Sequence, residues 1–484
     1  MKNLNASLIF YFIFTLCFFV NAQSPDRNQP PQLPDPKPLK LPPIRQFELS
    51  NGLKVILMEK HEIPLIQFNV VIKAGSVNDP EDKTGLANLT LDMMDEGAAG
   101  KSALEIADAI DFLGAQISTN AGQHYSEISL HTPLSKFDAA LRLLSDIVLH
   151  PDFPQTELDR KKKEQLTTIA QWHDQPTSIA GVAFNKFLYG DKHPYGKPSI
   201  GNEKTIKGFS IDDLKNFHTK YFKSNNAFIV VVGDIKKDEL KNELETVFSK
   251  WLKGNVEEKL IEEPSQVKKR TIYLIDKPGS EQSVIYIGRI GAARLTPDYN
   301  SIVVMNTILG GSFTSRLNDN LREQHGYSYG AGSRFRFGPI PGSFVAYSSV
   351  QTDVTDKALT EFFKELNGIS DPIPDPELNR GKNLVALSYP ANFQSVSDIA
   401  GQLEEIEEFS LPANYFDSYV TQMLNVKETE VNAAAKKYVV PDKMIIVVVG
   451  DKEKIENGIK ALNLGEIKNL SIEDILGKIP KIEN

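Results

Sequence analysis

The sequence predicts an α+β protein with two homologous domains, each a mostly antiparallel sheet packed with helices. Segments with strand-like and helix-like patterns alternate in blocks along the chain. One stretch of the first half returns in the second half, which indicates a duplication. The 484 residues are 41% hydrophobic and 24% charged, which is typical of a globular chain long enough for two to four domains.

Composition also excludes several functions. The formal net charge is −9, so a broad basic surface for nucleic acid is not expected. The single cysteine, Cys17, excludes an internal disulfide and any Cys-x-x-Cys metal or redox site. Composition therefore disfavours nucleic acid as a partner.

Residues 1–22 have the pattern of a signal peptide. An apolar run from Leu8 to Val20 is shorter than the roughly 20 residues needed to span a bilayer, and small residues precede the end at Ala22. Bulky neighbours argue against a lipid anchor on Cys17. We therefore expect an exported, soluble protein of the periplasm or the extracellular space, with the proline-rich segment 23–44 as an extended linker.

The first domain is predicted over 45–255 and opens with a β-hairpin. Two strand-like runs flank Ser50-Asn51-Gly52, which is turn chemistry. The elements expected next are a third strand at 65–74, helices at 84–95 and 103–112, strands at 116–121 and 125–132, and helices from residue 134 onward.

The duplication divides the rest of the chain. The segment Ile229-Val230-Val231-Val232-Gly233-Asp234 recurs as Ile446-Val447-Val448-Val449-Gly450-Asp451. Three other short matches keep nearly the same register: Tyr221 with Tyr438, 157–160 with 377–380, and 138–141 with 356–359. The sequence therefore predicts a second domain at 270–484, joined to the first by a charged linker at 256–269.

Several motifs, in this order, resemble the pitrilysin/insulinase (M16) family of zinc metallopeptidases. They are Ala74-Gly75-Ser76, Lys83-Thr84-Gly85-Leu86-Ala87, Tyr189-Gly190-Asp191 with His193-Pro194-Tyr195-Gly196, Val232-Gly233-Asp234, and Leu321-Arg322-Glu323 with Gly326-Tyr327-Ser328-Tyr329-Gly330. The chain is most similar to the shorter, two-domain class whose subunits work in pairs, like the processing peptidases. The resemblance implies that each subunit forms half of a clam-shell chamber.

Active members of this family carry His-x-x-Glu-His on a helix, because histidines four apart reach one zinc and the glutamate activates its water. The matching segment here is Asn88-Leu89-Thr90-Leu91-Asp92. Both histidines are replaced, Leu91 stands at the position of the base, and Thr168 stands where a further glutamate ligand is expected. The resemblance therefore implies no metal in this chain, with zinc in a partner subunit.

Other metal sites have weak support. None of the eight histidines forms a compact ligand pair. Asn88, Asp92 and Asp95 share a helical face, but hard cations need six or more oxygens, so a polar helix facing an aqueous chamber is favoured. The Gly310-Gly311 pair is interpreted as a turn between helices, although the processing peptidases have a longer glycine-rich loop nearby.

Arg322 and Tyr329 remain intact. In the family, the corresponding side chains hold the substrate carbonyl and stabilise the oxyanion near zinc. A guanidinium and a phenol are suitable donors for that charge. Without the family context, Arg322 would be expected to pair with an acid such as Asp319, and Tyr329 to pack in a strand.

The leading hypothesis is a noncatalytic, substrate-binding subunit of an exported zinc peptidase. A partner with His-x-x-Glu-His would bind an extended peptide, and Arg322 and Tyr329 would complete its active site in trans. One alternative is a peptide-binding or scaffold protein without a catalytic role. Another is an atypical active metalloendopeptidase.

Overall fold

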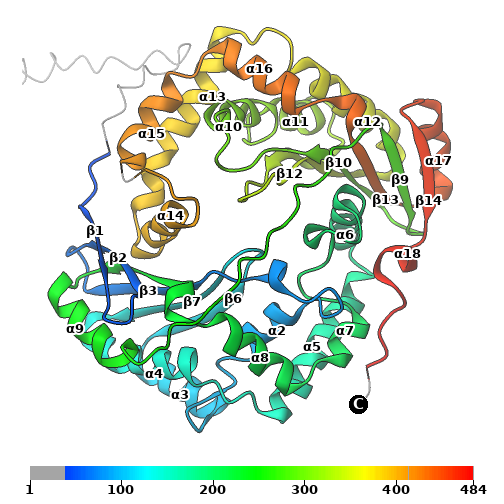
Figure 1. Cartoon of the computed structure of the whole chain (residues 1–484). Helices are drawn as coiled ribbons and strands as arrows, with labels where there is room; N and C mark the ends of the chain where they lie inside the picture. The colour runs from blue at the N-terminus through cyan, green and yellow to red at the C-terminus, as the bar shows by residue number, and fades with distance from the viewer. Residues whose placement is uncertain (1–38, 413, 483–484) are drawn as a thin grey trace, which may run out of the picture. The chain divides into compact units, whose positions relative to one another are not determined.

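The computed structural model describes residues 39–412 and 414–482. The predicted signal peptide, Cys17 and most of the proline-rich linker therefore lie outside the described residues. Within the described part, no helix is both long and apolar enough to cross a bilayer. The structure confirms an α+β fold with two six-stranded sheets packed with helices (Figure 1).

The first sheet has the order β1-β2-β8-β3-β7-β6. Its strands are β1 (Ile44–Glu48), β2 (Lys54–Glu59), β3 (Leu65–Ile72), β6 (Gln116–Ala121), β7 (Ser126–Pro133) and β8 (Ala227–Gly233). All neighbours are antiparallel except β2 and β8. The predicted hairpin is present, and Gly52 in its turn has a φ of 76°, a conformation that glycine adopts without strain.

The second sheet has the order β11-β12-β10-β13-β9-β14. Its strands are β9 (Thr271–Asp276), β10 (Gln282–Ile290), β11 (Ser328–Phe335), β12 (Ser343–Gln351), β13 (Ile445–Gly450) and β14 (Glu466–Leu470). Strand β9 pairs in parallel with both β13 and β14, and the other pairs are antiparallel.

The two sheets repeat one topology. The matching sequence segments 229–234 and 446–451 form β8 and β13, which are buried strands at corresponding places in the two sheets. The strand orders differ at one edge. The first sheet ends there with β1, the first strand of its half, and the second sheet ends there with β14, the last strand of its half. A duplication therefore explains why the two sheets otherwise share one strand order.

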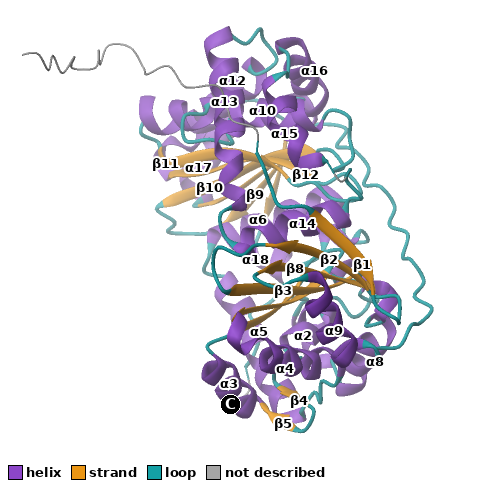
Figure 2. Cartoon of the chain, turned by 90° about the vertical axis from the view of Figure 1, so that its left-hand side faces the viewer, coloured by secondary structure: helices purple, strands orange, loops and turns teal. Residues whose placement is uncertain are grey.

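Helices cover both faces of each sheet, as Figure 2 shows. The first half contains α2 (Leu86–Asp92), α3 (Ala103–Leu113), α4 (Phe137–Leu149), α5 (Gln155–Trp172), α6 (Pro176–Tyr189), α7 (Glu203–Gly208), α8 (Ile211–Tyr221) and α9 (Lys237–Phe248). The second half contains α10 (Tyr299–Leu309), α11 (Arg316–Asn318), α12 (Thr355–Gly368), α13 (Asp375–Ser388), α14 (Val396–Glu408), α15 (Tyr415–Leu424), α16 (Glu428–Tyr438), α17 (Lys452–Ala461) and α18 (Ile472–Leu476).

Each half lends one helix to the sheet of the other half. Helix α6 packs on β13 and β10, and helix α14 packs on β8 and β3. The α6 contact is apolar, since Ile179, Ala183 and Phe184 join the buried cluster under the second sheet. The α14 contact is also apolar in part, since Ile399 and Leu403 belong to one buried cluster with Phe228 of β8. It includes polar groups as well: Asn69 Nδ2 donates to Glu404 Oε1 at 2.5 Å, and Lys54 Nζ lies 2.6 Å from Glu407 Oε2.

Candidate functional site

Helix α2, which carries the degenerate zinc motif, is fixed at its N-terminus by Gly85 and Asp79. Gly85 has a φ of 99°, and a Cβ there would lie 2.5 Å from the Ile200 carbonyl oxygen. The Asp79 carboxylate accepts hydrogen bonds from the backbone N–H groups of Gly85 and Ala87 at 2.7 and 2.8 Å. The Lys83-Thr84-Gly85-Leu86-Ala87 motif therefore has a structural role: it sets the direction of α2.

Asn88, Asp92 and Gln165 form the polar centre of this site. Gln165 Nε2, from helix α5, donates to Asn88 Oδ1 at 3.0 Å and lies 3.5 Å from Asp92 Oδ2. The Gln165 side chain is buried, and its Oε1 has no hydrogen-bond partner among the described residues. An amide thus links α5 to the two α2 residues that stand where histidines are expected.

Thr168 does not join this centre. Its hydroxyl donates to the Glu164 carbonyl of its own helix at 3.1 Å, and the side chain that reaches α2 is that of Gln165, three residues earlier. The side chain that contacts α2 therefore lies about one helical turn before Thr168, the position at which the glutamate ligand is expected. Gln165 has the length and shape of a glutamate without its charge, and this similarity could have been noticed in the sequence.

Leu91, at the position of the catalytic base, is completely buried. It belongs to the hydrophobic cluster beneath the first sheet, together with Leu89 of the same helix. A side chain in this position packs the core and has no contact with solvent.

Beside the centre lies a network of charges. Glu96 accepts from Arg160 at 2.5 Å and from Lys161 at 2.8 Å. Burial opposes ionisation of Glu96, but these two cations lower its pKa below the ordinary value. Burial raises the pKa of Asp92 and of Asp95, and the nearby charge of Lys161 offsets part of that rise. The positive charge near these acids therefore comes from lysine and arginine.

These donors do not fit zinc. Zinc prefers imidazole, thiolate and carboxylate ligands, whereas the centre offers two amides, one carboxyl group and a leucine. In residues 39–412 and 414–482, no three His, Cys, Asp or Glu side chains are placed to hold a metal ion. The arrangement can cross-link two helices by hydrogen bonds, but it has no group that activates a water molecule.

Arg322 lies in a π-helical turn, Asp319–Gln324, at the end of α11. Its guanidinium carbon is 4.6 Å from the ring centre of Phe313, an exposed side chain, and its Nη1 is 3.4 Å from Glu323. Asp319, the acid considered as its partner, instead accepts from Gln324. Arg322 is thus held by a cation–π contact and a weak ion pair at the surface.

Tyr329 projects from β11, the edge strand of the second sheet. The pairing of β11 with β12 is irregular between Ser328 and Ala331, and Tyr329 in this bulge is 92% exposed. No hydrogen bond holds its hydroxyl in the described structure. Its ring borders a cavity of about 310 Å³ that Tyr286 and Tyr347 also line. No contact joins Tyr329 or Arg322 to Asn88 or Asp92 within the described part of the chain.

Other motif residues have structural roles. The side chains of His124 and Tyr195 hydrogen-bond to each other, and His193 Nδ1 accepts the N–H of Tyr195 at 3.1 Å. Gly310 lies against β11, where a Cβ would approach Ser333 N to 2.3 Å. The Gly310-Gly311 pair is therefore a close contact between a helix end and a strand.

Known proteins agree with this architecture. The family model described as Insulinase (Peptidase family M16) matches residues 54–192, and the one described as Peptidase M16 inactive domain matches 208–385. A crystal structure of a peptidase M16 inactive domain from Pseudomonas fluorescens is 30% identical, covers 84% of this chain and 98% of its own, and has a TM-score of 0.79.

Two curated relatives differ in their names. The uncharacterized zinc protease YmxG of Bacillus subtilis is 24% identical over 412 residues, covering 84% of this chain and 98% of its own length. The non-peptidase homolog YmxG of Helicobacter pylori is 23% identical over 404 residues, covering 83% and 92%. The fold and the matches define a metallopeptidase homologue. This chain belongs to the M16 peptidase family, and its two sheets are two M16 domains, as the motifs indicated.

Proposed function

We propose that this chain is the noncatalytic, substrate-binding subunit of an exported zinc metallopeptidase of the M16 family. Its domains would span 45–255 and 270–484, and its partner would carry His-x-x-Glu-His and the zinc. Arg322 and Tyr329 would reach the partner's site and donate hydrogen bonds to the oxyanion of the peptide substrate.

The exposure of Tyr329 carries this proposal. A tyrosine ring is large and apolar, and leaving it 92% exposed on an edge strand forgoes the free energy of its burial. The bulge that turns it outward and the π-helical turn under Arg322 are both irregularities that often mark functional sites. Tyr329 is thus turned outward and Arg322 lies at the surface, while the chain's own centre lacks the groups for hydrolysis.

Substrate binding is supported by an open sheet edge. Strand β6 is the last strand of the first sheet, and its residues alternate between exposed and half-buried. Helix α2 packs against it, so the edge runs beside the degenerate centre. An extended peptide can add to such an edge by main-chain hydrogen bonds without any metal.

The decisive experiment uses Tyr329→Phe, which removes one hydroxyl and keeps the ring. The partner is first copurified from the native source and identified, and peptidase activity is then reconstituted with each variant. We expect kcat to fall by about 10²–10³, the usual cost of losing one oxyanion donor, with kcat/KM falling in parallel. Tyr327→Phe is the matched control, two residues away on the same segment, and should leave turnover unchanged.

Arg322→Lys tests the second donor. Lysine keeps the charge but loses the planar fork of the guanidinium, so turnover should fall while the complex still forms on size exclusion. Full activity of an intact Tyr329→Phe complex would refute the proposal. The alternative of a peptide-binding scaffold, which the name of the Helicobacter pylori relative favours, would then be preferred.

A further inference from the structure

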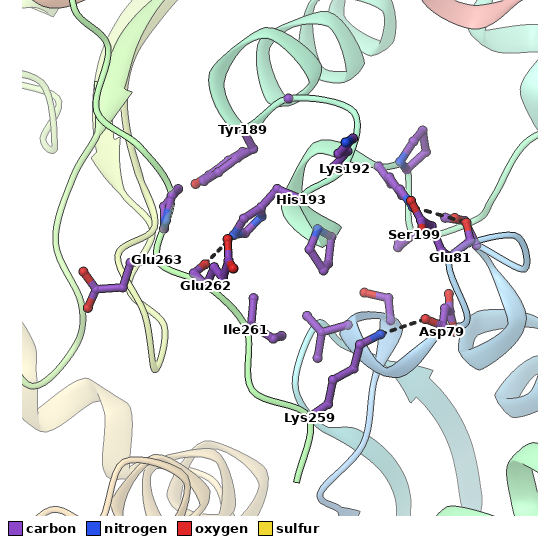
Figure 3. A pocket seen from close by; sticks show the side chains of 18 of the residues that line it. Asp79, Glu81, Tyr189, Lys192, His193, Ser199, Lys259, Ile261, Glu262 and Glu263 are labelled. Carbon is purple, nitrogen blue, oxygen red and sulfur yellow. Dashed lines mark hydrogen bonds between the residues drawn. The ribbon is translucent and has the colours of Figure 1, made fainter.

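A second candidate site lies between the interdomain linker and the first domain. Figure 3 shows a pocket with Lys259, Ile261, Glu262 and Glu263 of the linker on one wall. Loops of the first domain, around Asp79 and His193, form the other walls. Its volume of about 650 Å³ is in the range of pockets that enclose small ligands.

Three lysines line this pocket without a carboxylate partner. Lys259 Nζ donates to the backbone carbonyl of Asp79 at 2.9 Å, and Lys197 Nζ donates to the carbonyl of Glu81 at 3.2 Å. Lys192 is exposed and lies across the pocket from Lys259 in Figure 3. Among the described residues, no ion pair joins any of the three to an acid. Glu81, Glu262 and Glu263 also line the pocket, but none of them forms an ion pair with these lysines in the described structure, so the ammonium groups remain available to an anionic ligand group.

The carboxyl of Asp79 neutralises these lysines poorly. Burial raises its pKa to about 7, although the N–H groups of α2 oppose that rise. Its oxygens also accept the two backbone hydrogen bonds that fix α2. The ammonium of Lys259 is therefore directed at a carbonyl and keeps donors for a ligand.

The linker offers the pocket a main chain with free hydrogen-bonding groups. Residues 256–265 form no backbone-to-backbone hydrogen bond within the described structure. Two side-chain contacts hold them here: Lys259 Nζ donates to the carbonyl of Asp79, and His193 Nε2 lies 3.0 Å from the carbonyl of Glu262. Apolar groups complete the lining: Val77, Leu188, Leu260, Ile261 and four prolines. Open N–H and C=O groups beside apolar pockets are the features by which proteins bind extended peptides.

We propose that this pocket binds a short peptide that ends in a free carboxylate. The carboxylate pairs with Lys197 and Lys259, and the peptide main chain pairs with the linker. Such a ligand joins the linker to the loops of the first domain. Binding needs neither a partner subunit nor a metal, so its success or failure is independent of the function proposed above.

The test is calorimetric titration of the full mature chain with two tripeptides, acetyl-Ala-Ala-Leu with a free carboxylate and the same peptide as its C-terminal amide. We expect the amide to bind about tenfold to a hundredfold more weakly, the range for losing a charge-assisted hydrogen bond. Lys197→Gln should weaken binding of the free acid to a similar extent, and Lys192→Gln, at an exposed side chain across the pocket, should weaken it less. Lys357→Gln, at an exposed lysine of the second domain, is the matched control and should not change it.

Equal binding of acid and amide, or no binding of either peptide at millimolar concentration, would overturn the proposal. A third titration uses inorganic phosphate. If phosphate binds more tightly than the free-acid peptide, the pocket is an anion site without a role for the peptide chain, and the proposal also fails.

Discussion

Replacing Glu404 by glutamine should reduce the loss of stability that this protein suffers as pH rises. Glu404 lies on α14, against the first sheet, where Asn69 donates to it. Burial raises its pKa to about 8, and the charge of Glu127 on β7 adds to that rise. In Glu404→Gln, the amide oxygen still accepts from Asn69, but the group no longer titrates.

The direction of this pH effect follows from whether the folded or the unfolded state binds the proton of Glu404. Between pH 6 and pH 8 the folded protein keeps Glu404 largely protonated, whereas the unfolded chain, with an ordinary glutamate pKa, has lost that proton. Raising the pH therefore favours unfolding. With a folded pKa of about 8, this group alone lowers the free energy of unfolding by about 2 kcal/mol over that interval.

The assay is urea unfolding at pH 6 and pH 8 for the wild type, Glu404→Gln and a control. Glu408, whose pKa burial raises to about 7, titrates in the same interval but is present in all three proteins. Between pH 6 and pH 8, the free energy of unfolding of Glu404→Gln should fall by about 2 kcal/mol less than that of the wild type. Glu453→Gln, at an exposed glutamate of α17, should behave as the wild type. Equal losses in the wild type and Glu404→Gln would refute the assignment of this carboxyl as protonated.

Three further predictions concern the first domain. The first uses a variant in which His-x-x-Glu-His is restored at 88–92. Adding Gln165→Glu to it should tighten zinc binding in a chelator competition, and adding Thr168→Glu should not. Tighter binding with Thr168→Glu and not with Gln165→Glu would contradict the contacts of Gln165. Burial lowers the pKa of His124 to about 4, so the free energy of unfolding should fall by about 2 kcal/mol from pH 7 to pH 5, and His124→Gln should abolish that loss in the same urea assay. Gly85→Ala should destabilise the fold by at least about 1 kcal/mol in thermal unfolding, since the site requires a positive φ and closely approaches a carbonyl; an unchanged Tm would show that the loop adapts.

Sequence patterns were sufficient for the elements that bury one face. The strand predicted at 116–121 is β6, and the helix predicted at 103–112 is α3, one residue longer. Alternation and helical spacing record directly which side chains face a core, so these bounds are accurate. The expected helix at 84–95 is shorter in the structure, Leu86–Asp92, because Asp79 and the positive φ of Gly85 fix its start.

The candidate site depended on contacts that no local pattern records. Whether Gln165 or Thr168 meets Asn88 is decided by the rotation and depth of α5 against α2, and both positions fit the same helical face to within one turn. The outward direction of Tyr329 depends on a bulge, and that of Arg322 on a π-helical turn. Such irregularities shift a side chain from one face to another without any change of residue type.

The two interdomain contacts, made by α6 and by α14, differ although the two sheets share one topology. Helix α6 buries apolar side chains such as Phe184 on the second sheet, a contact whose free energy depends little on pH. Helix α14, at the corresponding place, also buries apolar side chains such as Leu403 against the first sheet, and it adds glutamates, with Lys54 paired to Glu407 and Asn69 donating to Glu404. Both contacts therefore depend on hydrophobic burial, and the α14 contact adds Glu404 and Glu408, whose pKa values burial raises to about 8 and about 7. The pH response expected for Glu404 is thus a property of one of the two contacts, and neither the repeat nor the shared topology would reveal it.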